Sequence, residues 1–108
     1  MSDFFKDVIE VVKLIPQGKV TSYGMIANYL GAKKSSRVVG WALNKVSQNI
    51  EIPAHRVVNR NGLLTGKNYF PNQNYMIDKL QKEGLNIKED SIVDFKTHLW
   101  DPIKELTI

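Results

Sequence analysis

The sequence predicts a mainly α-helical domain with a small β-hairpin wing. Three segments in the first half of the chain carry apolar residues at three- and four-residue spacing, which is typical of amphipathic helices. Between two short apolar runs further on stands Asn61-Gly62, a dipeptide suited to the left-handed conformations of a tight hairpin turn. Three helices followed by a hairpin are the plan of a winged helix-turn-helix.

The first expected helix covers residues 2–15. Its Ser-Asp start can cap a helix, and Pro16 and Gly18 then end it. The apolar residues that define its buried face are Phe5, Val8, Ile9, Val12 and Ile15.

Two short helices should follow, joined by the link 32–36. The hydroxyl of Thr21 or Ser22 can cap the first of them, which ends at Gly31, and the second opens at Ser35 or Ser36. This pair predicts a helix-turn-helix, whose second helix usually enters a groove of DNA. Helical hairpins also occur in proteins that bind no nucleic acid, so plain core packing remains an alternative.

The expected wing consists of two short strands within residues 56–66. A fourth helix is predicted over residues 73–85, with Gly84 as its stop. The last segment, 86–108, is net acidic and should pack onto the body through three apolar anchors: Phe95, Leu99 and Trp100.

The length of 108 residues suits one domain, spanning residues 1–108. No apolar run approaches the roughly 20 residues that cross a bilayer, and no signal peptide is recognisable, so we expect a soluble cytoplasmic protein without membrane association. The chain has no cysteine, and its two histidines lie at no close ligand spacing. We therefore expect no disulfide, no metal site and no cofactor.

Positive charge is concentrated in the middle of the chain. Residues 16–75 hold eight lysines and arginines against Glu51 alone, a net charge of +7, while both flanks are net acidic. A basic block of this kind favours a polyanionic partner. A solvated basic face without a ligand would show the same composition.

Four ordered motifs resemble a known family. IPQGKVTSYGMIANYLG, SSRVVGWAL, IPAHRVVNRNGLLTG and KLQKEG match, in order and approximate spacing, the DNA-binding domain of O(6)-alkylguanine-DNA alkyltransferases. Those proteins flip an alkylated guanine out of the duplex and move the alkyl group to the cysteine of a Pro-Cys-His-Arg motif. Here the motif reads Pro53-Ala54-His55-Arg56. Over nearly its whole length the chain therefore resembles the alkyltransferase-like proteins, which lack the acceptor cysteine.

Alanine at position 54 implies that the protein is not an enzyme. Alkyl transfer needs a strong nucleophile such as a thiolate primed by a histidine, and a methyl group supplies none. A hydrolytic alternative would use water beside His55, but the sequence offers no second group to polarise the leaving oxygen. Many alkyltransferase-like proteins have tryptophan at this position, so alanine implies a roomier pocket.

The resemblance assigns roles in DNA binding. Arg37 would be inserted into the base stack through the minor groove, and Tyr23 would crowd the phosphate of the target nucleotide and help to rotate it outward. Arg37 as a surface phosphate contact and Tyr23 as a core aromatic are the alternatives. A small residue at Gly40 would let the helix approach the groove closely. The remaining expected phosphate contacts are Lys33, Lys34, Ser35 and Ser36.

The resemblance also implies a pocket for the alkylated guanine, lined by Leu43, Pro53, Ala54, His55, Val57 and Lys67. Lys67 would lie against the face of the flipped base or contact a phosphate. His55 is expected to be a structural residue oriented by Glu83, and Arg56 to form a buried ion pair with an unidentified acid.

These implications describe a non-enzymatic damage sensor. It would bind double-stranded DNA containing O(6)-alkylguanine as a monomer and flag the lesion for nucleotide excision repair proteins, associated with the nucleoid if the source is bacterial. The alternative is a sequence-specific winged-helix transcriptional regulator. That function requires base-reading side chains on the third helix, where Val39, Gly40 and Leu43 are poor readers.

Overall fold

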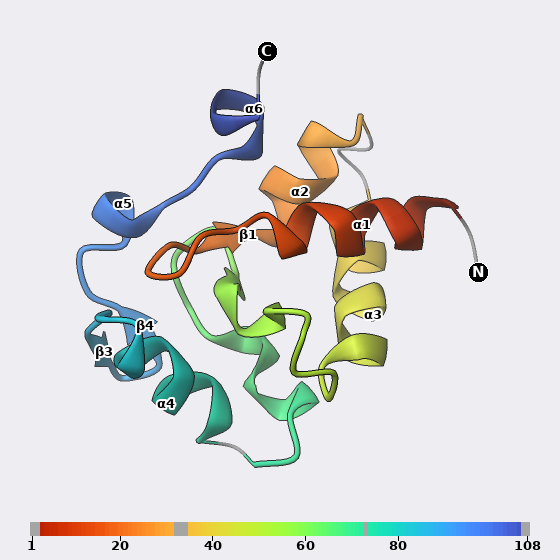
Figure 1. Cartoon of the computed structure of the whole chain (residues 1–108). Coiled ribbons are helices and arrows are strands. Elements are labelled where there is room, and N and C mark those ends of the chain that lie inside the picture. Colours follow the sequence, from red (N-terminus) through yellow and green to blue (C-terminus); the bar gives the residue numbers. More distant parts are fainter. Residues whose placement is uncertain (1–2, 32–34, 73, 107–108) are drawn as a thin grey trace.

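The computed structural model of the protein describes residues 3–31, 35–72 and 74–106 (Figure 1). The fold is mainly helical, with two small sheets of two strands each. Its elements, with 3-10 helices written η, are α1 (Asp3–Lys13), β1 (Thr21–Ser22), α2 (Tyr23–Tyr29), α3 (Ser36–Val46), η2 (Ala54–Arg56), β2 (Val57–Val58), η3 (Thr65–Tyr69), α4 (Tyr75–Lys82), β3 (Ile87–Lys88), β4 (Ser91–Ile92), α5 (Phe95–His98) and α6 (Pro102–Glu105). No helix in these ranges is long and apolar enough to span a membrane.

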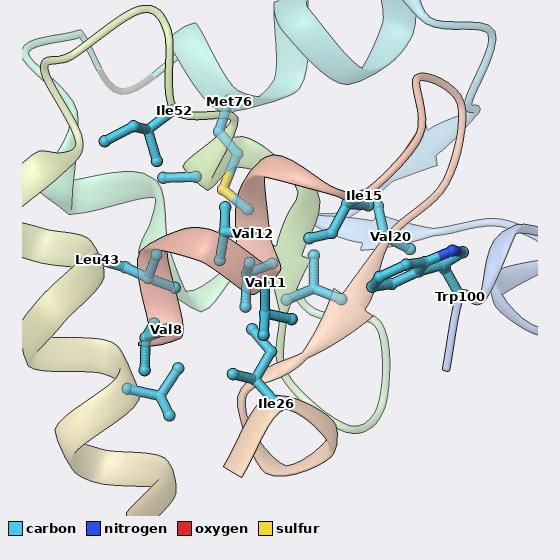
Figure 2. Close-up of a cluster of buried hydrophobic side chains, with 14 of the residues drawn as sticks. Val8, Val11, Val12, Ile15, Val20, Ile26, Leu43, Ile52, Met76 and Trp100 are labelled. Carbon is cyan, nitrogen blue, oxygen red and sulfur yellow. The ribbon is translucent and has the colours of Figure 1, made fainter. Parts of the chain in front are cut away.

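The hydrophobic core forms where α1 crosses the other helices (Figure 2). Val8 and Val12 of α1 are completely buried, since they lie four residues apart on one face. Side chains from elements distant in sequence join the same cluster, namely Ile26 of α2, Leu43 of α3 and Met76 of α4, while Trp100 lies beside Val20 at its other end.

The expected pair α2 and α3 is confirmed, and the two helices pack against each other. Ser22 caps α2, because its Oγ accepts a hydrogen bond from the backbone N–H of Met25 at 3.1 Å. Gly31 follows α2 with a φ of +77°, a conformation that glycine adopts without steric cost. Thus α3 packs against α2 (Figure 1), and Arg37 in its first turn is exposed.

The prediction of a β-hairpin within residues 56–66 is wrong. A turn does form, with the Asn59 N–H donating to the Leu63 carbonyl at 3.0 Å, but no second strand follows it. Instead β2 pairs in parallel with β1. Val57 and Val58 are both buried, and a buried parallel pairing inside the core takes precedence over the local hairpin signal.

An antiparallel hairpin does occur in the C-terminal segment, where β3 pairs with β4. The segment then runs back across the body. The Trp100 N–H donates to the Val20 carbonyl at 2.7 Å, and Val20 donates to His98 at 2.9 Å. Trp100 is buried as expected, while Phe95 and Leu99 are half-buried. At its end, α6 packs beside α2 (Figure 1).

Candidate nucleic-acid interface

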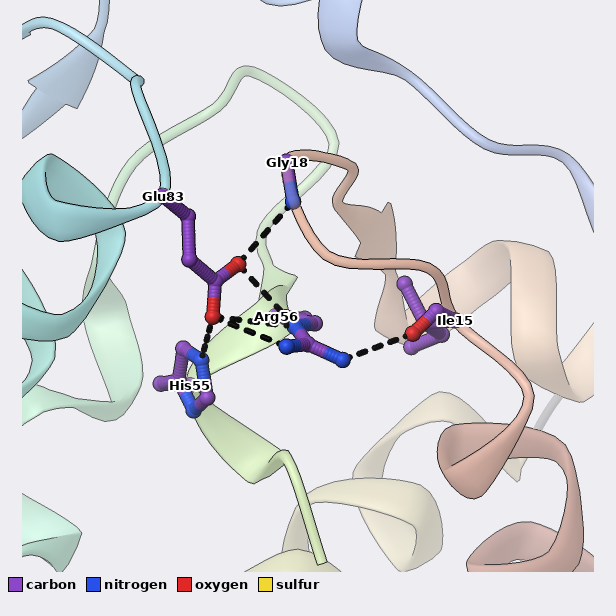
Figure 3. Close-up of polar contacts among 5 residues, drawn as sticks. All are labelled: Ile15, Gly18, His55, Arg56 and Glu83. Carbon is purple, nitrogen blue, oxygen red and sulfur yellow. Dashed lines mark hydrogen bonds and ion pairs between the residues drawn. The ribbon is translucent and has the colours of Figure 1, made fainter.

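A buried polar network fixes the loop that carries Ala54 (Figure 3). The Glu83 carboxylate lies 2.7 Å from His55 Nε2 and accepts hydrogen bonds from Arg56 Nε and Nη2 at 3.0 and 2.9 Å. It also accepts from the Gly18 N–H at 3.1 Å, and Arg56 Nη1 donates to the Ile15 carbonyl at 2.8 Å. Glu83 is thus the acid that Arg56 was expected to pair with.

The pKa values of the network indicate that it stabilises the fold. Burial alone would raise the pKa of Glu83, but hydrogen bonds from Arg56, His55 and Gly18 outweigh it and hold the pKa at about 2. Burial lowers the pKa of His55, against the opposing effect of its hydrogen bond to Glu83. The side chain beside His55 is the methyl group of Ala54, so the histidine has no thiol or hydroxyl to activate at that position.

A hollow of about 330 Å³ lies between α3 and η3. One wall comes from α3 and the other from the start of α2 and from η3. The hollow is lined by Tyr23, Ser36, Arg37, Gly40, Trp41, Thr65 and Tyr69.

Tyr23 is held at the back of this hollow by close packing. A Cβ atom on Gly66 would lie 2.8 Å from the Tyr23 hydroxyl, and one on Gly40 would lie 3.5 Å from the Tyr69 hydroxyl. Burial raises the pKa of Tyr23 to about 12, although its hydrogen bond with Thr65 acts in the opposite direction. The phenol therefore stays neutral at physiological pH and keeps a proton that it can donate to an acceptor such as a phosphate oxygen.

A second hollow of about 360 Å³ adjoins the first, because the two share Tyr23 and Ser36. Its other lining residues are Gly24, Asn59 and Arg60. We call the two hollows together the α3 groove. Arg37 and Arg60 are exposed there and make no ion pair with any residue that the structure describes. The groove therefore presents Arg37 and Arg60 as cations without an ion-pair partner in the described part of the chain.

The structure brings four of the expected DNA-binding residues together: Tyr23, Ser36, Arg37 and Gly40 all line the α3 groove. Lys33 and Lys34, also expected there, lie outside the described residues.

The residues expected to line an alkylguanine pocket lie elsewhere. Leu43, Ala54, His55 and Val57 are only 2%, 6%, 5% and 1% exposed, and they border neither part of the α3 groove. Pro53 is half-buried.

Lys67 is also separated from the groove. Its Nζ is ion-paired with Asp90 Oδ2 at 2.6 Å, and it borders a third hollow, of about 300 Å³. Thr65 is the lining residue that this hollow shares with the α3 groove. Lys67 therefore stands beside the groove, with its charge directed to Asp90.

Sequence reasoning missed six residues of the α3 groove: Gly24, Trp41, Asn59, Arg60, Thr65 and Tyr69. Trp41 follows Arg37 by four residues on the same helix, so helical periodicity would have placed the two on one face. Tyr69 carries no comparable local signal, because its position follows from how η3 packs on α3. Among the residues that the structure describes, no group of three His, Cys, Asp or Glu side chains is arranged to hold a metal ion.

Comparisons with known proteins agree with this geometry. The family model of the 6-O-methylguanine DNA methyltransferase DNA-binding domain matches residues 3–85. Alkyltransferase-like protein 1 of Schizosaccharomyces pombe is 33% identical over 94% of this chain and 98% of its own length. A DNA base-flipping protein of Escherichia coli is 33% identical over 91% of this chain and 74% of its own.

A solved structure shows that the similarity also holds for the fold. The crystal structure of S. pombe Atl1 in complex with damaged DNA containing O6-carboxymethylguanine matches this fold with a TM-score of 0.84. The match covers 94% of this chain and 98% of the other, at 30% sequence identity. None of the 108 residues is a cysteine, so the acceptor of alkyl transfer is missing. With a shared fold, matching length and no acceptor, the chain belongs to the alkyltransferase-like proteins, which are built on the 6-O-methylguanine DNA methyltransferase DNA-binding domain.

Proposed function

We propose that the protein is a non-enzymatic sensor of DNA damage. It binds duplex DNA through the minor groove at O(6)-alkylguanine, holds the base outside the helix, and leaves the alkyl group in place. The observation that carries this proposal is the α3 groove, which combines an unpaired arginine, a neutral tyrosine and aromatic walls in a chain with alanine at position 54.

Each part of the groove suits one step of base flipping. Arg37 stands on the exposed first turn of α3 and has no partner among the described residues, so it is free to enter the base stack and occupy the space that a flipped base leaves. Tyr23 lies between the two hollows, where its hydroxyl can press on a backbone phosphate. Arg60 and Ser36 are placed to hold the phosphates on either side.

The flipped base enters the hollow between α3 and η3. We keep Leu43, Ala54, Val57 and Pro53 as the proposed contacts of the alkyl group, with His55 as their structural support. Because Ala54 is only 6% exposed, such contacts require a rearrangement of the surrounding segments when DNA binds. Lys67 would then exchange Asp90 for the base or a phosphate.

Because the protein leaves the alkyl group on the guanine, other proteins must carry out the repair. We propose that a monomer bound to the lesion flags it for nucleotide excision repair, with Lys33 and Lys34 adding phosphate contacts. This role requires access to the chromosome, and hence a cytoplasmic, nucleoid-associated location if the source is bacterial.

A paired titration tests the proposal. One duplex carries a single O(6)-methylguanine, its twin carries guanine, and both are titrated at the same salt concentration. The sensor binds the modified duplex more tightly. Equal affinity for the two duplexes would favour a protein that reads sequence or charge alone and would refute the proposal.

A further inference from the structure

Trp41 lies at the edge of the α3 groove and has no role in the function proposed above. Its side chain is 56% exposed, whereas Trp100, the other tryptophan of the chain, is 6% exposed. A single exposed apolar residue needs no explanation by itself. The position of Trp41 is what distinguishes it.

Arg37, Gly40 and Trp41 are spaced three and four residues apart on α3, so they share one face of the helix. All three line the hollow of about 330 Å³. Gly40 contributes no side chain between them, and the Tyr69 hydroxyl approaches the helix there, 3.5 Å from where a Cβ atom on Gly40 would lie. The indole ring of Trp41 therefore stands beside the two tyrosines.

Two further aromatic rings, Tyr23 and Tyr69, line the same hollow from α2 and η3. Its volume falls in the range of protein sites for small organic molecules. A hollow with an indole on the α3 side and phenol rings on the opposite side suits a flat aromatic ligand. The exposed Arg37 beside these rings suits a negatively charged group. A nucleotide combines a flat ring with a negatively charged backbone, so it is the ligand class that fits the hollow.

We propose that Trp41 stacks on the face of the flipped guanine and thereby contributes to the recognition of the lesion. This inference rests on the proposed function, which supplies a base outside the helix. A base inside the duplex has both faces covered by its neighbours, whereas a flipped base exposes both. Stacking on Trp41 therefore favours DNA whose target base leaves the stack easily, a property of modified or mispaired bases.

Two substitutions of Trp41 separate stacking from simple apolar contact. Trp41→Phe keeps an aromatic face, and Trp41→Leu keeps only apolar bulk. Trp41→Leu should weaken binding of the O(6)-methylguanine duplex about ten-fold, the scale of one lost base–aromatic stack, while changing the affinity for the unmodified twin much less. Trp41→Phe should retain most of the preference. Thermal unfolding of both variants checks that the fold is intact.

Tryptophan fluorescence gives an independent readout. In the parent protein, stacking of a purine on Trp41 should quench the emission when the modified duplex is added. Trp41→Phe is the matched control, since it leaves the buried Trp100 as the only tryptophan and, with excitation selective for indole, should show little quenching.

The outcomes separate this inference from the function beneath it. If the parent prefers the modified duplex and Trp41→Leu shows the same preference, the stacking role is refuted and the proposed function stands. An equal loss for both duplexes would make Trp41 a general contact to DNA and would also refute stacking. If the parent itself shows no preference, both proposals fall.

Discussion

Among single residues, Arg37 and Tyr23 are the side chains on which the proposed DNA binding most depends. Both line the hollow between α3 and η3, but they are held differently: Arg37 is exposed, and Tyr23 is packed against Gly66. An exposed, unpaired arginine contributes little to folding. Its substitution should therefore affect DNA binding far more than stability.

Arg37→Ala should weaken binding to the O(6)-methylguanine duplex by roughly 1 to 3 kcal/mol, because a stacking contact in the duplex is lost. Fluorescence anisotropy with a labelled duplex measures this change. Lys96→Ala is the matched control, since Lys96 is an exposed cation of α5 outside the α3 groove. If the two variants lose the same small amount of affinity, Arg37 is only one of many surface charges.

The ionisation of Glu83 makes the stability of the fold depend on pH. Its pKa of about 2 in the folded protein is below the ordinary value of 4.5, so the stabilisation that it provides is complete above pH 4.5 and is lost as the pH falls toward 2. The lowered pKa of His55 acts in the same direction, starting below its ordinary value of 6.5. The free energy of unfolding should therefore decrease as the pH falls below about 6.5.

Glu83→Gln should lower the free energy of unfolding at pH 7 by about 3 kcal/mol, because Arg56 loses its buried counter-charge. The difference from the parent should shrink between pH 4.5 and pH 2, where the parent carboxylate becomes protonated. Urea denaturation across this pH range measures both effects, with the exposed Glu51→Gln as control. A difference that stays constant with pH would show that the carboxylate charge is not responsible.

At the scale of elements, η3 connects the fold to the α3 groove. Thr65 and Tyr69 of this short helix line the hollow, and Gly66 lies against Tyr23. Ser47, at the end of α3, donates its hydroxyl to the Tyr69 carbonyl at 2.7 Å. The shape of the hollow therefore depends on how closely η3 approaches the start of α2.

Gly66→Ala should displace the Tyr23 ring, because the added Cβ would lie 2.8 Å from its hydroxyl. We expect weaker binding to the modified duplex, about ten-fold, as for a misplaced contact. The ring edge can shift toward the open hollow, so the loss of stability should be smaller than for a core substitution. Unchanged binding by Gly66→Ala would mean that Tyr23 does not need its observed position.

The turn at Gly62 joins the body to the C-terminal segment. Gly62 has a φ of +82°, and an added Cβ would lie 2.9 Å from the Phe95 ring. Gly84 also has a positive φ, of +96°, but no atom lies within 4 Å of the Cβ position. The two glycines thus form a matched pair that separates backbone strain from contact.

Gly84→Ala should lower the free energy of unfolding by about 1 kcal/mol, through left-handed strain alone. Gly62→Ala should cost about 2 to 4 kcal/mol, since overpacking against Phe95 is added to the same strain. Urea denaturation at neutral pH measures both. Equal losses of unfolding free energy in the two variants would show that the Phe95 ring moves away freely and does not restrict the turn.

At the scale of the whole molecule, local signals in the sequence were enough for α1, α2, α3 and α4, whereas η2, η3, α5 and α6 were not predicted. The spacing of Val8 and Val12 and the cap at Ser22 depend on residues within one or two turns. The hairpin failed because Asn61-Gly62 describes only a turn, whereas the partner of β2 is β1, more than thirty residues earlier. Pairing over such distances depends on burial of the whole core, which no local pattern contains.

The site was predictable to the extent that its residues lie in motifs. Tyr23, Ser36, Arg37 and Gly40 share a hollow, as their motif positions implied. Tyr69 enters that hollow only through the packing of η3. Ala54 and Val57 are only 6% and 1% exposed, a burial that motif matching alone does not describe.

The charge of the whole molecule should control affinity without choosing the lesion. If three phosphates are neutralised, raising monovalent salt from about 50 to about 200 mM should weaken binding roughly 40-fold through counterion release. The ratio of affinities for the two duplexes should stay nearly constant, because the flipped base carries no charge of its own. A ratio that collapses with salt would indicate that recognition of the lesion is electrostatic.

The most direct test of the central claim is the mass of both partners after they have been together. The protein is incubated in excess with the O(6)-methylguanine duplex for hours, and intact protein and DNA strands are then weighed by mass spectrometry. Both masses should be unchanged after recovery from a complex that formed. A protein heavier by one methyl group, or a strand lighter by one, would contradict it.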